Sequence, residues 1–207
     1  MNNSKDGKCQ IIGLLGHQGV GKNYIAEQVL PKVLPKKNTV VIAFADHLKI
    51  NCITKQGADY DKVYGKKDYE TRKLLQIEGT EEGRDKYGKD IWINTLHAWI
   101  KVLNSRGVER FIISDVRFSN EVDWIQSVGG SIIKIEAPKR YLARLTSETG
   151  GDPQRIKELK EHASEKNIDN IDTFDFIINN DPEYNPMDEI KCQTILFSII
   201  ATKWTKI

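Results

Sequence analysis

The stretch from residue 9 to residue 34 constrains the fold of this chain most. An apolar run, Cys9 to Leu15, leads into the loop Gly16-His17-Gln18-Gly19-Val20-Gly21-Lys22, and residues 23–30 follow with the apolar spacing of a helix. Glycines let consecutive backbone N–H groups turn inward around an anion, and the helix that follows adds its positive N-terminal end. The complete G-x-x-x-x-G-K spacing between a strand and a helix therefore predicts a phosphate-binding loop.

The end of this loop carries its chemistry. Lys22 places a full positive charge on the β- and γ-phosphates of a nucleotide. The next residue is usually Ser or Thr, whose hydroxyl binds Mg²⁺, but here it is Asn23, whose amide oxygen can still face a hard cation directly or through water. The alternative interpretation is a glycine-rich turn without a ligand. The expected contacts of the donor nucleotide are Gly16, Gly19, Val20, Gly21, Lys22, Asn23 and Tyr24.

Length and composition favour a single domain. The 207 residues suit a single domain, 1–207, with a small lid, and 31 basic residues against 29 acidic ones do not give the charge excess of a general nucleic-acid binder. The three widely spaced cysteines favour a reducing compartment rather than a disulfide framework. Residues 1–8 lack an apolar signal core, and the run 195–201 is too short to span a bilayer, so we expect a cytoplasmic protein with no membrane partner.

Strand-like and helix-like segments alternate along the chain, which favours a parallel sheet covered by helices on both faces. Trp92, Leu96, Trp99 and Leu103 repeat at helical spacing, and we interpret them as a core stripe rather than a cofactor site. We expect strands at 9–15, 38–45, 108–114, 131–136 and 174–178. We expect helices at 22–34, 68–76, 90–104 and 119–128, one opening at Pro138, and a closing helix from 188 or 189 to about 203, with loop or broken helix at 78–88.

Two strands end in carboxylates. Asp115 follows an apolar strand downstream of the phosphate loop, the position of a carboxylate that orders Mg²⁺ and its waters, and Arg117 lies two residues further on. The alternative is an ion pair at the strand end. Asp46 ends the preceding strand and either meets a ligand in the same crevice or caps the next helix.

The charged segment 149–170 is flanked by glycines and poor in large apolar residues, and it predicts a mobile lid followed by a return helix. Arg140 and Arg144 share a helix face just before it. His162 lies in this segment, and a lone histidine there is also compatible with a surface or packing role.

Six motifs together resemble the deoxynucleoside monophosphate kinases of bacteriophages and large DNA viruses. They are G-x-x-x-x-G-K, FADHLK, R-K-L-L-Q-x-x-G-T-E-x-G-R, Y-G-x-D-x-W, S-D-V-R-F-x-N-E and H-A-S-E, and the resemblance covers most of the chain, from about residue 10 to 180. The segment 115–121 is the most specific of them. Where that family has an acidic and then a hydroxyl residue after the lysine, this chain has Asn23 and Tyr24.

The resemblance implies a three-layer α/β P-loop kinase fold with a five-stranded parallel sheet, a helical substrate-binding region at 46–90 and a lid at 145–168. It implies transfer of the γ-phosphoryl group of ATP, with Mg²⁺, to a deoxynucleoside monophosphate, and a homodimer is one known arrangement. The implied catalytic residues are Lys22, Asp115, Arg117 and Arg144, with Asn23 and Asp115 at the metal. The implied substrate contacts are Asp46, Lys49, Arg72, Gln76, Arg84, Arg140, Arg155, His162 and Glu165.

Three other functions are weighed against this one. Another small-molecule P-loop kinase, of the dephospho-coenzyme A or shikimate type, would carry the same loop. A GTPase-like switch would need a guanine-specific N-K-x-D element, which the sequence lacks. A nucleic-acid-binding module with a vestigial loop is opposed by the near-balanced charge.

Overall fold

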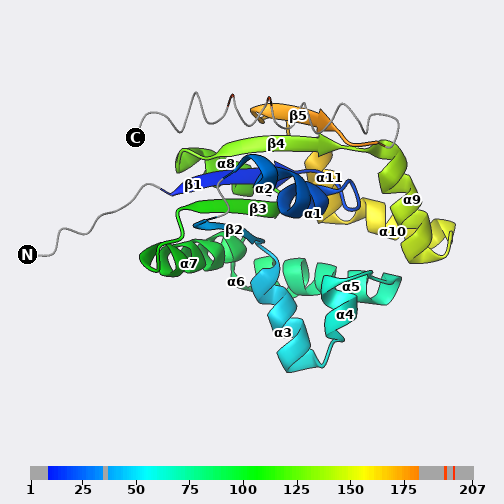
Figure 1. Cartoon of the computed structure of the whole chain (residues 1–207). Coiled ribbons are helices and arrows are strands. Elements are labelled where there is room, and N and C mark those ends of the chain that lie inside the picture. Colours follow the sequence, from blue (N-terminus) through cyan, green and yellow to red (C-terminus); the bar gives the residue numbers. More distant parts are fainter. Residues whose placement is uncertain (1–8, 35–36, 182–193, 195–197, 199–207) are drawn as a thin grey trace, which may run out of the picture.

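Five parallel strands form the centre of the fold, in the order β2-β3-β1-β4-β5 (Figure 1). The structure is a computed structural model that describes residues 9–34, 37–181, 194 and 198. The strands are β1 (Gln10–Leu15), β2 (Thr39–Ile42), β3 (Arg110–Val116), β4 (Ser131–Glu136) and β5 (Phe176–Asn179). The first residue of each strand lies within two positions of the start expected from the sequence, and all the pairings are parallel, so the predicted parallel sheet is confirmed.

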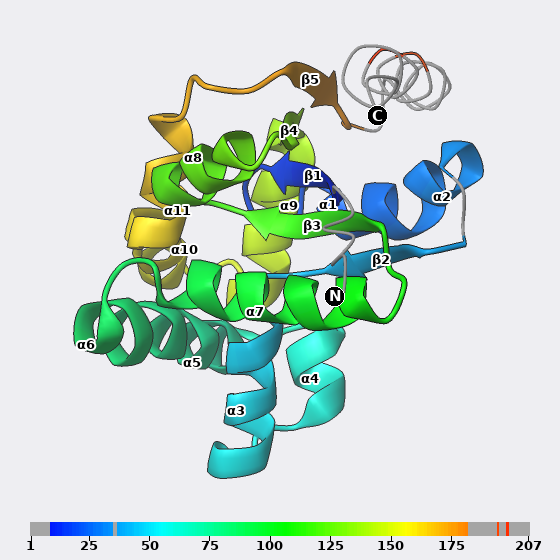
Figure 2. The same ribbon diagram turned by 90° about the vertical axis from the view of Figure 1, so that its left-hand side faces the viewer.

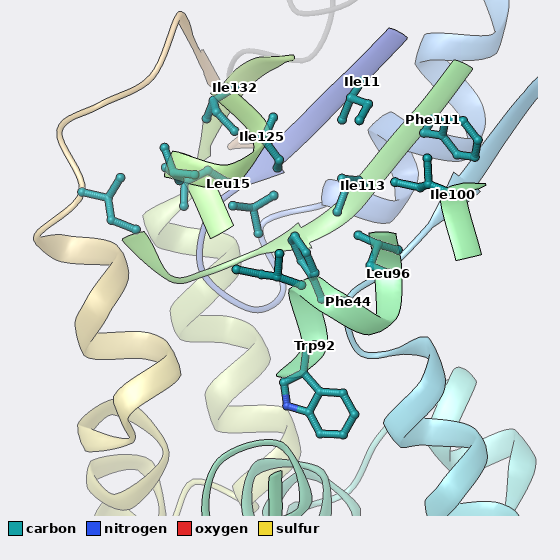
Figure 3. Packing of buried hydrophobic residues seen from close by; sticks show 14 of the residues in the cluster. Ile11, Leu15, Phe44, Trp92, Leu96, Ile100, Phe111, Ile113, Ile125 and Ile132 are labelled. Atoms are coloured by element: carbon teal, nitrogen blue, oxygen red, sulfur yellow. The ribbon is translucent and has the colours of Figure 1, made fainter. Parts of the chain in front are cut away.

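Helices cover both faces of the sheet because apolar side chains alternate along its strands. In β1, Ile11 and Leu15 belong to one core cluster, and Ile12 and Leu14 belong to the other. The first cluster packs under α3 (Asp46–Gln56), α7 (Ile91–Ser105) and α8 (Ser119–Ser127), and Figure 3 shows its interdigitated side chains. The second packs under the helix after the phosphate loop, and Figure 2 shows α8 and α2 on opposite sides of the sheet.

The helix after the phosphate loop has the expected extent but not a uniform geometry. It consists of α1 (Lys22–Tyr24), the π-helix η1 (Ile25–Val29) and α2 (Leu30–Val33). Pro31 has no N–H to continue the α-helical ladder and its ring crowds the carbonyl four residues earlier. A π turn directly before it, closed by the Leu30 N–H bonding to the Ile25 carbonyl, changes the hydrogen-bond register at that point.

Residues 46–90 form a helical arm that hangs from the end of β2 (Figure 1). After α3 come α4 (Tyr60–Tyr64), α5 (Tyr69–Gly79), the π-helix η2 (Thr80–Arg84) and α6 (Asp85–Tyr87). The helical turn thus continues through the segment expected to be a loop or broken helix. Gly83 is there for packing rather than for a turn, since a Cβ on it would lie 2.5 Å from Cζ2 of Trp92.

The segment after β4 contains α9 (Pro138–Thr149), α10 (Pro153–Glu161) and α11 (Ala163–Asp169). Gly150 and Gly151 separate the first two of these helices, both with positive φ. The assignment of 145–168 as a lid, and its motion, stays a prediction. The expected closing helix at 188–203, the run 195–201 and the start of the chain, 1–8, lie outside the described residues apart from the isolated positions 194 and 198.

The prediction for Trp99 was wrong. Trp92 and Leu96 are buried in the core, but Trp99 is 47% exposed. Ile93 and Ile100 are buried as well, which shifts the centre of the buried stripe and leaves Trp99 at its edge. Four-three-four spacing identified the right helix but not the centre of its buried face.

In the described part of the chain, no helix combines the length and the apolar character needed to cross a membrane.

We expect Ile113→Val to lower the free energy of unfolding by about 1 kcal/mol, because Ile113 is fully buried in the first cluster and loses one methylene. Denaturant titration measures this change. Trp99→Gln serves as the control and should change the free energy by no more than about 0.5 kcal/mol, because its side chain is half exposed. A larger effect at Trp99 than at Ile113 would contradict this core.

Candidate active site

A cleft of about 380 Å³ opens at the carboxyl ends of the parallel strands, within the size range of small-molecule sites. Its walls come from the phosphate loop, the helical arm, the end of β3, α9 and the start of α11. Positive side chains outnumber negative ones, which suits an anionic ligand. The cationic lining residues are Lys22, Lys49, Lys67, Arg72, Arg84, Arg117 and Arg144, and the carboxylates are Asp115 and Glu121.

The phosphate loop takes its shape from two glycines. Gly19 and Gly21 have φ of 75° and 92°, a region that other residues rarely adopt. A Cβ at Gly19 would lie 2.7 Å from Cβ of Arg144, and one at Gly21 would collide with the side-chain amide of Asn180. Asn180 donates to the Val20 carbonyl at 2.8 Å, so the end of β5 clamps the loop from behind.

Lys22 lies inside the loop. Its Nζ donates to the carbonyls of Gly16 and His17 at 2.5 and 2.6 Å, and the residue is only 7% exposed. Burial, assisted by the positive charge of Arg117, lowers the pKa of Lys22 to about 7, although Glu165 and Asp115 act in the opposite direction. An anion bound in the loop would favour the charged form.

Asp115 is the last residue but one of β3 and reaches across to the loop after β2. Its two carboxylate oxygens accept the backbone N–H groups of Phe44 and Ala45 at 2.8 and 3.0 Å. Each oxygen keeps a further lone pair, and the residue lines the cleft. Asn23 lines the same cleft from an exposed position. The described residues contain no cluster of three or more His, Cys, Asp and Glu side chains that could hold a metal.

Glu165 is a buried junction between the loop, β3 and α11. It forms an ion pair with Arg117 and accepts from Nδ1 of His17 at 3.0 Å and from the Gln18 N–H at 3.3 Å. Burial alone would raise its pKa, but Arg117, His17 and Lys22 together hold the pKa of Glu165 at about 2. The structure therefore places Glu165 behind the cleft, where it positions Arg117 and the loop.

Glu121 is a second buried carboxylate, and it holds the backbone at Arg117 together with the side chain of Arg84. It accepts the backbone N–H groups of Arg117 and Phe118 at 2.8 and 3.1 Å, and Arg84 at 2.5 Å. Burial raises the pKa of Glu121 to about 7 despite the charge of Arg84. Arg84 also stacks 3.8 Å from the centre of the Phe118 ring. Arg84 is thus held at the junction of the helical arm and β3.

A third buried carboxylate joins the helical arm to α9. Glu148 takes two hydrogen bonds from Arg72, at 3.0 and 3.2 Å, and one from Nε of Arg144 at 2.6 Å. Its side chain is fully buried. Only Nε of Arg144 is used in this contact, and among the residues that the structure describes its two terminal nitrogens have no hydrogen-bond partner, so they can face a ligand.

His162 and Gln76 add uncharged polar atoms to the cleft. The Ser164 N–H donates to Nδ1 of His162 at 3.2 Å, so the proton of the neutral ring lies on Nε2. Burial lowers the pKa of His162, which favours this neutral form. Nε2 of His162 and Nε2 of Gln76 are both buried without a partner among the described residues, and both residues line the cleft.

The structure does not bring every expected contact into the cleft. Tyr24 is 58% exposed outside it, and Arg155 is exposed and stacks over Tyr69 at 4.7 Å. Asp46 does not line the cleft. Its carboxylate accepts from the Ala43 N–H at 2.8 Å and from Lys49 at 3.2 Å. Arg140 is not a lining residue either, and its Nε is buried without a partner among the described residues. Gly16 and Val20 support the loop from below, Val20 as part of the second core cluster.

Several lining or supporting residues were not foreseen. Lys67 belongs to no motif that spacing makes visible, and Gln18 occupies an unspecified position of the phosphate-loop motif. Glu148 lies four residues after Arg144 on the same helix, but its contact with Arg72 is long-range. Glu121 lay inside the quoted S-D-V-R-F-x-N-E motif, so its position in that motif was the available signal. Asn180 follows the last strand directly, at the edge where the cleft opens, which was a weaker signal.

Comparisons with known proteins agree with this geometry. The family model described as phosphomevalonate kinase matches residues 14–131, more than half of the chain. A protein of Acanthamoeba polyphaga mimivirus, provisionally named a deoxynucleotide monophosphate kinase, is 27% identical over 189 residues, which cover 82% of this chain and 88% of that protein.

Solved structures resemble the fold at low sequence identity. TT1252 from Thermus thermophilus is 14% identical with a TM-score of 0.53, and the match covers 93% of this chain and 97% of that one. The dephospho-CoA kinase from Campylobacter jejuni is 15% identical with a TM-score of 0.48, over 96% and 100% of the two chains. The first of these supports the α/β fold.

We expect Lys22 to take up a proton when ATP binds at pH 8, and we expect no such uptake when ATP binds at pH 6. With a pKa of about 7, Lys22 is mostly neutral at pH 8 in the free protein and regains its charge beside the phosphates, whereas at pH 6 it is charged already. Calorimetry in buffers of different ionisation enthalpy measures the uptake. In Lys22→Met the uptake at pH 8 should vanish, and an unchanged value would show that another group titrates.

We expect Glu148→Gln to lower the free energy of unfolding by about 3 kcal/mol, because it leaves two partly buried arginines without their counter-charge. Glu82→Gln is the matched control, since Glu82 pairs with Lys86 on the exposed face of the arm, where solvent screens the pair, and its loss should leave the free energy of unfolding nearly unchanged. Equal effects in urea titrations of the two variants would refute a structural role for the Glu148 junction.

Proposed function

Because the chain belongs to the phosphomevalonate kinase family of P-loop kinases and is therefore a phosphotransferase, we propose that it transfers the γ-phosphoryl group of ATP to a deoxynucleoside monophosphate. The observation that carries this proposal is the cleft itself, where a phosphate loop and four arginines from separate elements converge. The triphosphate of a single nucleotide needs fewer positive side chains than the seven lysines and arginines that line this cleft. A donor and an acceptor that both carry phosphate account for them.

The donor side of the cleft is the phosphate loop. The positive-φ glycines turn backbone N–H groups towards the phosphates, and Lys22 reaches the β- and γ-phosphates. Arg144 lies against Gly19 of this loop with its terminal nitrogens open. It is therefore placed to neutralise the charge that moves from donor to acceptor during transfer.

The acceptor side is the helical arm together with the end of β3. Arg117 and Arg72 are planar forks of donors that suit the oxygens of a phosphate monoester. Buried carboxylates hold both, Glu165 in one case and Glu148 in the other, so that their orientation is fixed before the acceptor arrives. Such preorganisation lowers the entropy cost of bringing the two phosphates together.

The same end of the cleft offers a surface for a nucleobase. Leu75, Trp92 and Phe118 give it an apolar wall, and Gln76 and His162 give it buried polar atoms that lack partners among the described residues. A flat heterocycle with polar edges complements both. The provisional name of the mimivirus relative agrees with this substrate class.

Mg²⁺ fits this donor set. Asp115 keeps free lone pairs at the cleft, and Asn23 lies beside the loop, so these two would hold the ion or its waters while the phosphates supply further ligands. When bound, the ion neutralises charge on the β- and γ-phosphates.

The reaction needs no strong general base. A monophosphate is largely dianionic near pH 7, so its oxygen is already a nucleophile, and catalysis consists of positioning and charge neutralisation. Lys22, Arg117 and Arg144 supply that neutralisation. Closure of 145–168 over the cleft would exclude water, which competes as an acceptor.

A panel of acceptors tests the proposal. With ATP and Mg²⁺, ADP release should require one or more deoxynucleoside monophosphates and should vanish in Lys22→Ala, which loses several kcal/mol of transition-state stabilisation. Phosphomevalonate, shikimate and dephospho-coenzyme A complete the panel. If the protein phosphorylates one of these three compounds and none of the monophosphates, the proposed acceptor is wrong and that compound takes its place.

We expect Arg117→Lys to weaken use of the acceptor far more than binding of ATP. Lysine keeps the charge but loses the two-pronged geometry, at a cost of about 1–3 kcal/mol for a charge-assisted contact. Kinetic constants for the monophosphate, compared with calorimetric ATP affinity, separate the two effects. A loss confined to ATP affinity would assign Arg117 to the donor instead.

A further inference from the structure

Gln18, the third residue of the phosphate loop, is buried in an unusual way. It is 2% exposed, and both its side-chain atoms, Nε2 and Oε1, are buried without a hydrogen-bond partner among the described residues. A buried amide left unpaired costs free energy, and native proteins rarely keep one without a reason. Because Gln18 also lines the cleft, a ligand that enters the cleft can supply the missing partner.

The surroundings of Gln18 indicate which ligand this is. Its backbone N–H donates to Glu165, the carboxylate that also holds Arg117, so Gln18 lies on the side of the loop that faces Arg117. The residue before it, His17, offers its carbonyl to Lys22, and the residue after it, Gly19, packs against Arg144. The loop positions on either side of Gln18, and the carboxylate that its N–H contacts, therefore each touch one of the three cations expected at the transferred phosphoryl group, Lys22, Arg144 and Arg117.

We propose that the side-chain amide of Gln18 donates a hydrogen bond from Nε2 to an oxygen of the γ-phosphoryl group of ATP. The inference rests on the proposed function, because it needs ATP as the donor in this loop. The β-phosphate is served by the loop backbone and Lys22. The γ-phosphoryl group extends beyond them towards the acceptor, on the side of the loop where Gln18 and Arg117 share the partner Glu165 and both line the cleft.

A neutral amide has an advantage at this position. It adds a directional donor without adding a charge to a cleft already crowded with cations, whose mutual repulsion another cation would increase. The unpaired amide destabilises the free protein, and the bond to ATP removes the part of that penalty that belongs to the Nε2 donor. The contact is then made only when the terminal phosphate is present.

The test compares Gln18→Met with Gln10→Met. Methionine keeps the length of the side chain and removes both polar amide atoms. Gln10, the first residue of β1, also has a buried unpaired oxygen, but it lies at the opposite end of that strand from the loop and does not line the cleft. It therefore controls for the loss of a buried amide as such.

The readout is the affinity for ATP and for ADP, measured by calorimetry with Mg²⁺ on both variants and on the wild type. Gln18→Met should weaken ATP binding about tenfold, the value of one hydrogen bond to a charged group, and leave ADP binding unchanged. Its melting temperature should equal or exceed that of the wild type. Gln10→Met should leave both affinities unchanged.

Two outcomes would overturn the proposal. Equal weakening of ATP and ADP would assign Gln18 to loop structure, and unchanged ATP affinity would show that the amide does not reach the γ-phosphoryl group. These results do not depend on the acceptor. A wild type that binds ATP but phosphorylates no monophosphate would refute the proposed acceptor alone, and the ratio of ATP to ADP affinity would still decide the role of Gln18.

Discussion

The buried carboxylate of Glu165 is the contact on which the arrangement of the cleft depends. It is the point where the phosphate loop, the end of β3 and α11 meet, through His17, Gln18 and Arg117. A carboxylate at the protein surface would be screened and would contribute little. Here it is almost fully buried and has three partners, so its removal would leave positive charge uncompensated in a low-dielectric setting.

Glu121 and Glu148 are also buried carboxylates that bind arginines. Together the three carboxylates explain how the protein without a ligand stays folded although many positive charges lie around its cleft. The four arginines that line the cleft come from α5, η2, the end of β3 and α9, and they repel one another. Each buried carboxylate neutralises part of that charge and fixes one or two guanidinium groups, while the remaining N–H donors stay available. The charge that would disrupt an empty cleft is thereby kept ready for phosphate.

Much of this architecture follows from local sequence. The apolar runs predicted the five strands, and the central strands β1, β3 and β4 show why, because a parallel strand buried on both faces requires such a run. The G-x-x-x-x-G-K spacing located the phosphate loop at the centre of the sheet. Glu148, Gln18 and Asn180 were not predicted, because their contacts with Arg72, Glu165 and Val20 join positions 76, 147 and 160 residues apart. Trp99 shows the limit on the helical side, where periodicity finds a stripe but tertiary packing decides its centre.

The strand order has a consequence for how this fold accommodates new chemistry. The phosphate loop follows β1, the middle strand of the sheet, whereas the helical arm is one continuous excursion between the edge strand β2 and α7. The loop proposed to bind the donor is thus anchored in the core, and much of the wall proposed to meet the acceptor belongs to a segment attached at the periphery. Replacement of the helical arm, residues 46–90, would therefore change the acceptor without any change to the sheet. Acceptor specificity would then depend largely on one continuous stretch of the sequence.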